Sequence, residues 1–186
     1  MRALTNGFRQ FLRLPEWFYL REAKLGDREA FGKLYQLYVD KIYRFCYFRV
    51  GQKKEDAEDL TADIFLKAWQ KLDTFTTGNF QAWLYMIARN SVIDFYREKK
   101  ARIPLDESVA DGKPSLLEMV SVSLEVDRVK KAMKQLSQEQ QEVLLLRFTE
   151  DMSHREIAQI VKKSEEAVRA LQYRALKELK GKLGNE

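Results

Sequence analysis

The stretch SHREIAQIVKKSEEAVRALQYRALKEL, residues 153–179, decides the fold of this chain. It contains two helix starts. SHRE at 153–156 fits the S-x-x-E capping box, and in SEE at 164–166 a serine precedes acids that suit a helix N-terminus. Their spacing predicts a short helix over 154–161, a tight turn, and a longer helix from 165 to about 183. This layout is typical of a helix-turn-helix.

The two helices of such a motif cross where small or branched apolar side chains allow close approach. Ala158, Val161 and Val168 have the spacing that this crossing requires, so we expect them to be buried. Lys162 occupies the place of the usual turn glycine. A left-handed residue other than glycine costs on the order of 1 kcal/mol, so the turn is predicted to form at some cost in stability.

The longer helix has one inward and one outward face. If Val168 faces inward, a step of about 100° per residue puts Leu171, Ala175 and Leu179 beside it. Gln172 also falls on this inward side, without an evident partner. The outward face and its flanks hold the candidate contacts to duplex DNA, which are Glu166, Arg169, Ala170, Tyr173, Arg174 and Lys177. Long basic side chains beside an alanine and a tyrosine suit close approach to a major groove. The alternative is an ordinary solvated basic helix.

The composition of the whole chain favours an all-α protein with a polyanionic partner. Only three prolines and eight glycines interrupt the 186 residues. The net charge is +5. Cys46 and His154 are the only residues of their types, which excludes an intrachain disulfide and a multi-cysteine or multi-histidine metal site. Because no nucleophile constellation or glycine-rich phosphate loop is supported, we expect no catalytic residues, bound metal or cofactor.

Helical periodicity also marks the first half of the chain, from Asp27 onward. The apolar residues of the first helix, which ends at Gly51, are expected to be buried: Phe31, Leu34, Tyr35, Tyr38, Ile42, Phe45 and Cys46. A second helix over about 54–72 turns another apolar set inward: Ala57, Leu60, Ile64, Ala68 and Leu72. The segment DTFTTGN, 73–79, reads as a loop, and a third helix starts near Phe80 and ends in a basic cluster.

Three aspartates form a stripe on the outward side of the second helix. Asp56, Asp59 and Asp63 stand at i, i+3 and i+7, so they face away from the apolar set. A single exposed aspartate is usually only solvated, but this is less common for three acids in register.

Charge and periodicity divide the chain into four segments. Residues 103–124 contain prolines, lose the periodicity and are acidic, so they are predicted to be a flexible linker between two small helical domains. The first domain covers 20–102 and the second 125–186, where the segment SQEQ supplies a further capping box. Residues 1–19 are interpreted as a loosely ordered leader. The alternative is a short amphipathic element docked on the body or on a membrane surface.

Several segments resemble, in the same order, the two domains of the extracytoplasmic-function (ECF) sigma factors of bacteria. They are DREAFGKLYQLYVDKIYRFCYFRVG, AEDLTADIFLKAW, FQAWLYMIARNSVIDFYREKKAR, LSQEQQEVLLLRFTEDMSHREIAQIV and EEAVRALQYRAL. The resemblance spans roughly residues 20–182. The second and third segments are the most specific, since helix-turn-helix patterns occur in many unrelated proteins.

The resemblance implies two roles for the first domain. In this family the helix that corresponds to AEDLTADIFLKAW docks on the clamp helices of the largest polymerase subunit, which implies core binding for Asp56, Asp59 and Asp63. The loop that corresponds to 73–79 captures a flipped-out base of the minus-ten promoter element. The candidate contacts to this melted strand are Phe75, Asn79, Phe80, Arg89, Arg97, Lys99 and Lys100. For Phe80 a place in the core is the favoured alternative.

For the whole chain, the resemblance implies a transcription initiation factor that is not an enzyme. Its expected partners are core RNA polymerase and promoter DNA, as duplex at the minus-thirty-five element and as melted strand at the minus-ten element, with no small-molecule substrate. The linker would thread through the polymerase toward the RNA exit path. Family members are often held inactive by an anti-sigma factor, frequently membrane-bound. The expected location is therefore the cytoplasm, at the nucleoid through polymerase or tethered at the membrane.

Two other functions fit parts of the sequence. A helix-turn-helix regulator that binds operator DNA, usually as a dimer, would not need the loop 73–79 beside a basic helix. A small helical enzyme acting on nucleic acid would need metal ligands, for which only pairs such as Asp59 and Asp63 are available. A transcription assay with purified core polymerase separates these functions from a sigma factor.

Overall fold

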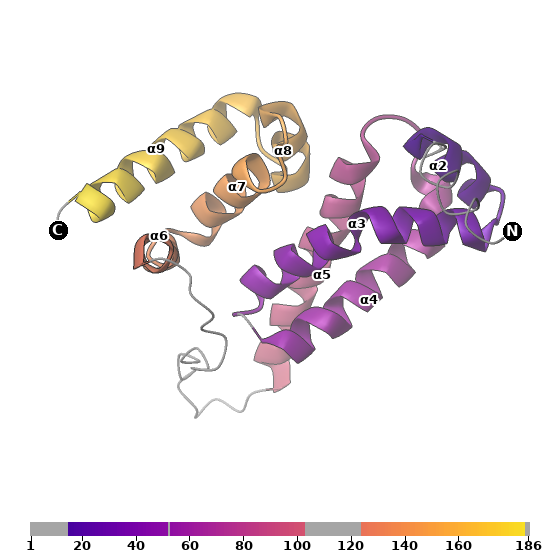
Figure 1. The fold of residues 1–186 in the computed structure, drawn as a ribbon, viewed down its shortest axis with the longest axis horizontal. Helices are drawn as coiled ribbons and strands as arrows, with labels where there is room; N and C mark the ends of the chain where they lie inside the picture. Colours follow the sequence, from indigo (N-terminus) through magenta and orange to yellow (C-terminus); the bar gives the residue numbers. More distant parts are fainter. Residues whose placement is uncertain (1–14, 52, 103–123, 185–186) are drawn as a thin grey trace, which may run out of the picture.

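The computed structural model describes residues 15–51, 53–102 and 124–184. These ranges are helical, without a strand, which confirms the predicted all-α class. The helices are α2 (Glu16–Lys24), α3 (Arg28–Arg49), α4 (Lys54–Gln70), the 3-10 turn η1 (Leu72–Thr74), α5 (Phe80–Arg102), α6 (Leu124–Lys134), α7 (Gln138–Phe148), α8 (His154–Val161) and α9 (Glu165–Gly184). Figure 1 shows two groups, α2–α5 and α6–α9. Residues 1–14 of the expected leader and 103–123 of the expected linker lie outside the described residues.

The first group is built around α3, α4 and α5. α3 begins where it does because the Asp27 carboxylate accepts hydrogen bonds from the backbone N–H groups of Glu29 (2.8 Å) and Ala30 (3.2 Å). It ends at Arg49, and two residues farther on the chain turns at Gly51, whose φ of +74° suits a residue without a Cβ. The buried residues of the three helices include Leu34, Tyr38, Ile42, Phe45, Cys46, Ala57, Leu60, Ile64, Ala68, Leu84 and Ala88. Most of the predicted inward face of α3 is therefore confirmed.

Two aromatic residues of α3 depart from that prediction. Tyr35 is 41% exposed and Phe31 is only half-buried, because both lie at the edge where α3 meets α4. Phe31 packs against Trp69 with ring centroids 4.9 Å apart, and Tyr35 packs against Phe65 at 4.7 Å. Phe31 and Tyr35 therefore lie at the surface between the two helices instead of filling the core, although Phe65 beneath Tyr35 is buried.

Part of the expected leader is an ordered helix. α2 starts at Glu16 and crosses residue 20, where the sequence suggested that the first domain begins. The Tyr38 hydroxyl donates a hydrogen bond to the Glu16 carboxylate (2.8 Å), and Ala23 is buried. Lys24 Nζ donates to the backbone carbonyl of Phe75. α2 therefore ties the N-terminal segment both to α3 and to the loop that precedes α5.

Serine caps start α7, α8 and α9, as the sequence predicts. Ser137 with Gln140 and Ser153 with Glu156 both form complete capping boxes. The Ser164 hydroxyl accepts a hydrogen bond from the backbone N–H of Ala167 (3.2 Å) at the start of α9. These bonds satisfy backbone donors that a helix start leaves unpaired.

The turn between α8 and α9 is the left-handed turn that the sequence predicts. Lys162 has φ 56° and ψ 49°. Ala158, Val161 and Val168 are buried where the helices cross. The helix-turn-helix therefore forms with a lysine in the place of the usual glycine.

α6 is a helix that the sequence analysis did not predict. The segment was not recognised as a helix because the acids near its start resemble the acidic composition of the preceding linker. Farther along the helix, Ala132 is buried and Met133 is half-buried, and Leu136, just after the end of the helix, is buried as well. Leu136 and Met133 pack in a small cluster with Ala175 of α9. This contact across the fold, which helical periodicity alone does not reveal, stabilises α6.

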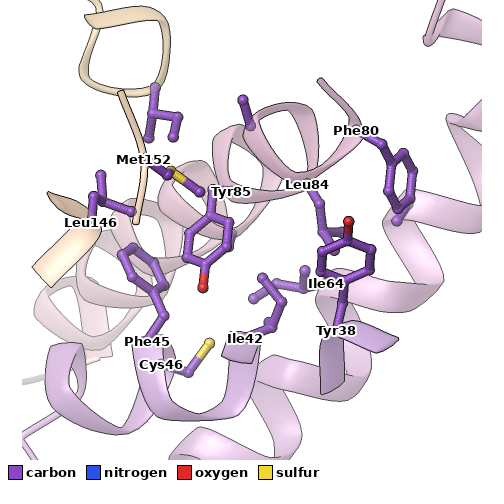
Figure 2. Packing of buried hydrophobic residues seen from close by; sticks show 14 of the residues in the cluster. Tyr38, Ile42, Phe45, Cys46, Ile64, Phe80, Leu84, Tyr85, Leu146 and Met152 are labelled. Atoms are coloured by element: carbon purple, nitrogen blue, oxygen red, sulfur yellow. The ribbon is translucent and has the colours of Figure 1, made fainter. Parts of the chain in front are cut away.

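The two groups of helices share one buried cluster. Leu146 of α7 and Met152, from the loop before α8, lie with Phe45 of α3 and Tyr85 of α5 (Figure 2). Each of these four residues is at most 3% exposed. The second group is thus packed directly on the first.

Candidate nucleic-acid and polymerase interfaces

The predicted duplex-binding residues lie together on one exposed face of α9. All six are exposed: Glu166, Arg169, Ala170, Tyr173, Arg174 and Lys177. Tyr173 is 69% exposed, whereas Val168 and Ala175 on the inward face are fully buried. At 1.5 Å per residue, the face is about 16 Å long. It has the size and the mixed basic and small side chains that a major groove admits.

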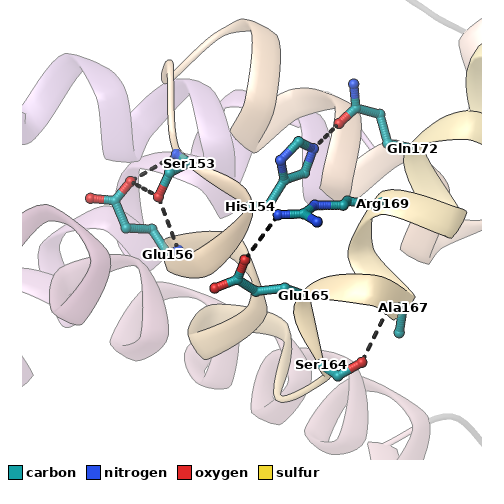
Figure 3. A network of polar contacts seen from close by, with 8 residues as sticks. All are labelled: Ser153, His154, Glu156, Ser164, Glu165, Ala167, Arg169 and Gln172. Atoms are coloured by element: carbon teal, nitrogen blue, oxygen red, sulfur yellow. Dashed lines mark hydrogen bonds and ion pairs between the residues drawn. The ribbon is translucent and has the colours of Figure 1, made fainter.

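Two acids, Glu165 and Glu166, set the electrostatics at the start of this face. Arg169 Nη2 lies 3.3 Å from Glu165 Oε2 in an exposed i, i+4 ion pair (Figure 3). The pKa of Glu166 is lowered, because its own backbone N–H and the Ser164 hydroxyl donate hydrogen bonds to its carboxylate. The first two turns of α9 therefore offer both a strong donor, Arg169, and an ionised acceptor, Glu166.

Gln172, unexplained in the sequence, has a partner in the structure. Its Oε1 lies 2.7 Å from Nε2 of His154, the first residue of α8 (Figure 3). This contact joins the two helices of the helix-turn-helix at the end opposite their turn. It helps to fix the angle at which α9 is presented.

The acidic stripe of α4 is only partly available to a partner. Asp59 and Asp63 are exposed, and neither has an ion-pair partner among the residues that the structure describes. Asp56 is half-buried, with Oδ2 3.7 Å from Lys99 Nζ. Two carboxylates thus remain free to meet a basic surface.

An apolar groove that the sequence analysis missed adjoins this stripe. Steps of about 100° along α4 place Leu66 about 20° around the helix from Asp59, on the side away from Asp63. Leu66 is 55% exposed. The shallow groove between α3 and α4 has a volume of about 320 Å³ and is lined by Arg28, Phe31, Phe65, Leu66 and Trp69. In the sequence Phe31 is interpreted as core, and Phe65, Leu66 and Trp69 are not singled out, so this surface had no signal of its own.

The Asn79 side chain makes two hydrogen bonds at the end of the loop before α5. Its side-chain oxygen accepts a hydrogen bond from the backbone N–H of Ala82 (3.2 Å), which caps the helix. Its Nδ2 donates to the Glu156 carboxylate of the second domain. Burial opposes ionisation of Glu156, but hydrogen bonds from Ser153 and Asn79 prevail and lower its pKa. Alanine at position 79 would remove a cap worth about 1 kcal/mol, whereas serine would keep a capping oxygen.

The aromatic residues predicted near Asn79 are buried. Phe75 is 8% exposed and Phe80 only 2%. Their ring centroids are 5.6 Å apart, and Phe80 lies 5.4 Å from half-buried Trp83. Phe80 therefore has the core position that the sequence favoured as the alternative. In this conformation these rings support the loop and do not offer faces to a base.

The basic candidates of α5 are spread along the helix. Arg89 is 18% exposed, with Nε 3.1 Å from the buried Glu142 Oε1. Arg97 is 80% exposed beside Asp94, and Lys99 pairs with Asp56. Lys100 lies in α5, but its side chain is outside the described residues. Arg97 stands about 27 Å along the helix from Asn79, so the seven predicted residues do not form one compact patch.

Two acids of the second domain are buried, and the sequence did not reveal their burial. Glu142 is 2% exposed and Glu150 is 6% exposed. An acid on an amphipathic helix is ordinarily solvated, and only the tertiary contact buries it. Among the described residues, no cluster of three or more His, Cys, Asp or Glu side chains suits a metal ion. In the same ranges, every helix is too short or too polar to span a bilayer.

Comparison with known proteins gives matches over both groups of helices. A family described as Sigma-70 region 2 matches residues 34–102, and one described as Sigma-70 region 4 matches residues 132–181. The chain is 39% identical over 86% of its length to the ECF RNA polymerase sigma factor BldN of Streptomyces coelicolor, and spans 62% of that protein. It is 32% identical over 76% of its length to SigW of Bacillus subtilis, and spans 82% of it.

Two solved structures have a similar fold. One is CnrH in complex with the cytosolic domain of CnrY, which has a TM-score of 0.68 and 27% identity, with 91% of this chain and 97% of that chain covered. The other is the sigma factor RpoE in complex with the anti-sigma factor NepR from Bartonella quintana, with a TM-score of 0.66 and 28% identity over 84% of this chain and 98% of that chain.

Proposed function

Because this chain belongs to the ECF family of RNA polymerase sigma factors, we propose that it binds core RNA polymerase and directs transcription initiation at particular promoters. Residues 20–102 act as the region 2 domain, 103–124 as a linker through the polymerase, 125–186 as the region 4 domain and 1–19 as a leader. The chain has no catalytic role and needs no cofactor. It works in the cytoplasm, at the nucleoid through the polymerase.

The observation that carries this proposal is the exposed face of α9. A sigma factor must present its recognition helix to duplex DNA while it is bound to polymerase. α9 does this with Arg169, Tyr173 and Lys177 on one unobstructed surface. Base contacts near the start of the helix and phosphate contacts farther along it would read the minus-thirty-five element.

Core polymerase binds α4 in this proposal. Asp59 and Asp63 meet basic residues of the polymerase, and Leu66 beside Asp59 adds an apolar contact next to the groove. Charge supplies steering and register, while the apolar contact supplies affinity. Asp56 contributes less, since Lys99 already neutralises it.

The loop before α5 holds the melted minus-ten strand. Asn79 reads a base edge with its amide, and Arg89, Arg97, Lys99 and Lys100 bind the backbone along α5. The buried Phe75 and Phe80 keep the loop in shape. An anti-sigma factor regulates access to these surfaces, and a membrane-bound one would tether the chain at the membrane.

A transcription reaction with purified core polymerase tests the proposal. The chain should confer promoter-specific starts that core polymerase alone does not make. Reversing Asp59 and Asp63 to Lys should abolish core binding, because like charges at a close interface cost on the order of several kcal/mol. Titration of fluorescent chain with core polymerase measures this directly.

Asp40→Lys is the matched control for the charge reversal. Asp40 is exposed in the same domain, about 180° around α3 from Phe31 and hence away from the groove. This variant should bind core polymerase as the wild type does. Unchanged core affinity of the Asp59→Lys, Asp63→Lys chain, with normal helicity by circular dichroism, would reject α4 as the docking surface. Absence of specific transcripts with the wild type would reject the function as a whole.

A further inference from the structure

The outer face of α2 holds two large apolar side chains in solvent. Trp17 is 61% exposed, and Leu25, which follows the last residue of the helix, is 75% exposed. Arg21 lies between them in the sequence and is exposed as well. The three residues stand at i, i+4 and i+8, so steps of about 100° keep them within about 80° around the helix. They form the outer stripe of α2.

The opposite face of α2 holds the helix on the first domain. The Glu16 carboxylate accepts a hydrogen bond from the Tyr38 hydroxyl (2.8 Å), and Ala23 is buried. Because these contacts fix the rotation of α2, the outer stripe is turned away from the body of the domain. Glu22 lies beside Arg21 (3.3 Å) and offsets part of its charge. Most of the positive charge in this region therefore comes from the residues before α2.

Those preceding residues are basic and rich in large apolar side chains. Residues 1–14 contain the arginines Arg2, Arg9 and Arg13 and no aspartate or glutamate. The large apolar residues of the same segment are Leu4, Phe8, Phe11, Leu12 and Leu14. We call residues 1–14 the arginine segment. Only Pro15 separates it from α2 in the sequence, so its charges are tethered next to the outer stripe.

A partner that fits this region must offer negative charge next to an apolar phase. A DNA duplex offers phosphates, but its surface is aqueous and gives leucine and tryptophan side chains little to enter. An anionic lipid bilayer offers both, because its headgroups attract arginine and the boundary with the acyl chains takes up tryptophan, phenylalanine and leucine. The nine residues of α2 extend about 13 Å, so the helix can lie on a bilayer but not cross it.

We propose that the arginine segment and the outer stripe of α2 bind the surface of an anionic lipid bilayer. The arginines supply the attraction to the headgroups, and Trp17 and Leu25 enter the boundary beneath them. This binding needs neither polymerase nor promoter DNA, so it does not rest on the proposed function. It also differs from tethering by an anti-sigma factor, because the chain itself contacts the lipid.

The position of α2 in the fold suits such binding. Figure 1 shows α2 at one end of the molecule and the C-terminal part of α9 at the other. A bilayer that holds the chain at α2 therefore leaves the exposed face of α9 in solution. Lipid binding and duplex binding would use separate surfaces of the chain.

Cosedimentation of the full chain with vesicles tests the role of the arginines. Vesicles of phosphatidylglycerol and phosphatidylcholine should bind the wild type, and vesicles of phosphatidylcholine alone should bind it far less. Each basic residue near an anionic surface changes the affinity by about fivefold. The triple variant Arg2→Gln, Arg9→Gln, Arg13→Gln should therefore lose affinity for the anionic vesicles by on the order of 100-fold.

The triple variant Lys53→Gln, Lys131→Gln, Lys134→Gln is the matched control. It removes the same net charge from exposed positions on α6 and at the start of α4, both of which lie away from α2 (Figure 1). It should bind the anionic vesicles as the wild type does. All chains should keep the same helicity by circular dichroism.

Two variants of Trp17 test the apolar contact. Trp17→Ala should bind the anionic vesicles about tenfold more weakly. Phe148→Ala, at a site on α7 that is 63% exposed, should bind them normally. Brominated acyl chains should quench the fluorescence of the bound wild type. Trp17→Phe, which keeps the half-buried Trp69 and Trp83, should show little quenching.

Equal vesicle affinity of the arginine variant and the wild type would overturn the proposal. Equal quenching of the wild type and Trp17→Phe would overturn the contact made by the outer stripe. If the arginine variant keeps its vesicle affinity but loses affinity for a duplex without a promoter, the segment binds DNA and the bilayer is rejected. Failure of the proposed function would look different, since a chain that supports no specific transcription would still give every expected vesicle result.

Discussion

Arg169 and Lys177 lie on the same face of α9, yet we expect their loss to affect promoter binding in different ways. Arg169 is in the first turns, where a recognition helix enters the groove most deeply, and Lys177 stands about 12 Å farther along the helix. Arg169→Ala should therefore relax the preference for a matched minus-thirty-five sequence. Lys177→Ala should instead weaken the binding of all sequences alike.

The expected loss of promoter discrimination in Arg169→Ala can be estimated from the contact that Arg169 makes in the structure. To contact a base, Arg169 must leave Glu165, an exposed i, i+4 pair at 3.3 Å that is worth only about 0.3–0.5 kcal/mol. A bidentate contact to a base contributes about 1–3 kcal/mol of discrimination. The base contact therefore prevails, and Arg169→Ala should lose about tenfold in specificity. Lys177→Ala should reduce the slope of log affinity against log salt concentration by about 0.9, which corresponds to one phosphate.

The assay is holoenzyme binding to matched and singly mismatched promoters at several salt concentrations. Glu165→Gln serves as the control, because it frees Arg169 without removing it. This variant should bind at least as tightly as the wild type and keep the wild-type preference. If Arg169→Ala and Lys177→Ala give the same specificity profile, the assignment of base and phosphate contacts along α9 is wrong.

Two further predictions concern single residues. Replacing Lys162 with Gly should stabilise the second domain by about 1 kcal/mol relative to Lys162→Ala, because only glycine adopts the left-handed turn without strain. Equal denaturation midpoints of the two variants would refute this. Cys46 is fully buried, and burial raises the pKa of its thiol to about 12. Its contribution to stability should be intact below the unfolded pKa of about 9 and fall as the pH rises toward 12. The wild type should therefore lose stability faster than Cys46→Ala over that range in denaturant titrations, and Cys46 should resist alkylation at pH 8 until the protein unfolds.

The parts of the fold that were predictable from sequence depend on short-range patterns. The capping boxes at Ser137 and Ser153 and the left-handed turn at Lys162 depend on residues a few positions apart, and all three are confirmed. The inward face of α9 follows from the step of the helix once Val168 is taken as buried. These features need no knowledge of the partner helices.

The parts that were not predictable depend on contacts between distant residues. Glu142 reads as one more solvated acid until α7 is placed on α5, and Tyr35 and Phe31 read as core until the edge between α3 and α4 is seen. Asn79 was expected to be a free loop amide, and its roles as helix cap and as donor to Glu156 appear only in three dimensions. The candidate minus-ten residues do not form one patch for the same reason. Their nearness in the sequence does not determine which of them are buried or paired with the second domain in the fold.

α2 contacts the loop before α5, although Lys24 of the helix and Phe75 of the loop are separated by 51 positions in the chain. Lys24 donates to the carbonyl of Phe75 and lies 5.4 Å from the centre of its ring. The shape of the loop proposed to bind the minus-ten strand therefore depends on an N-terminal helix outside the proposed DNA contacts. If the proposed function is correct, whatever binds or displaces that helix would change promoter melting while leaving the proposed docking of α4 on the polymerase unaltered.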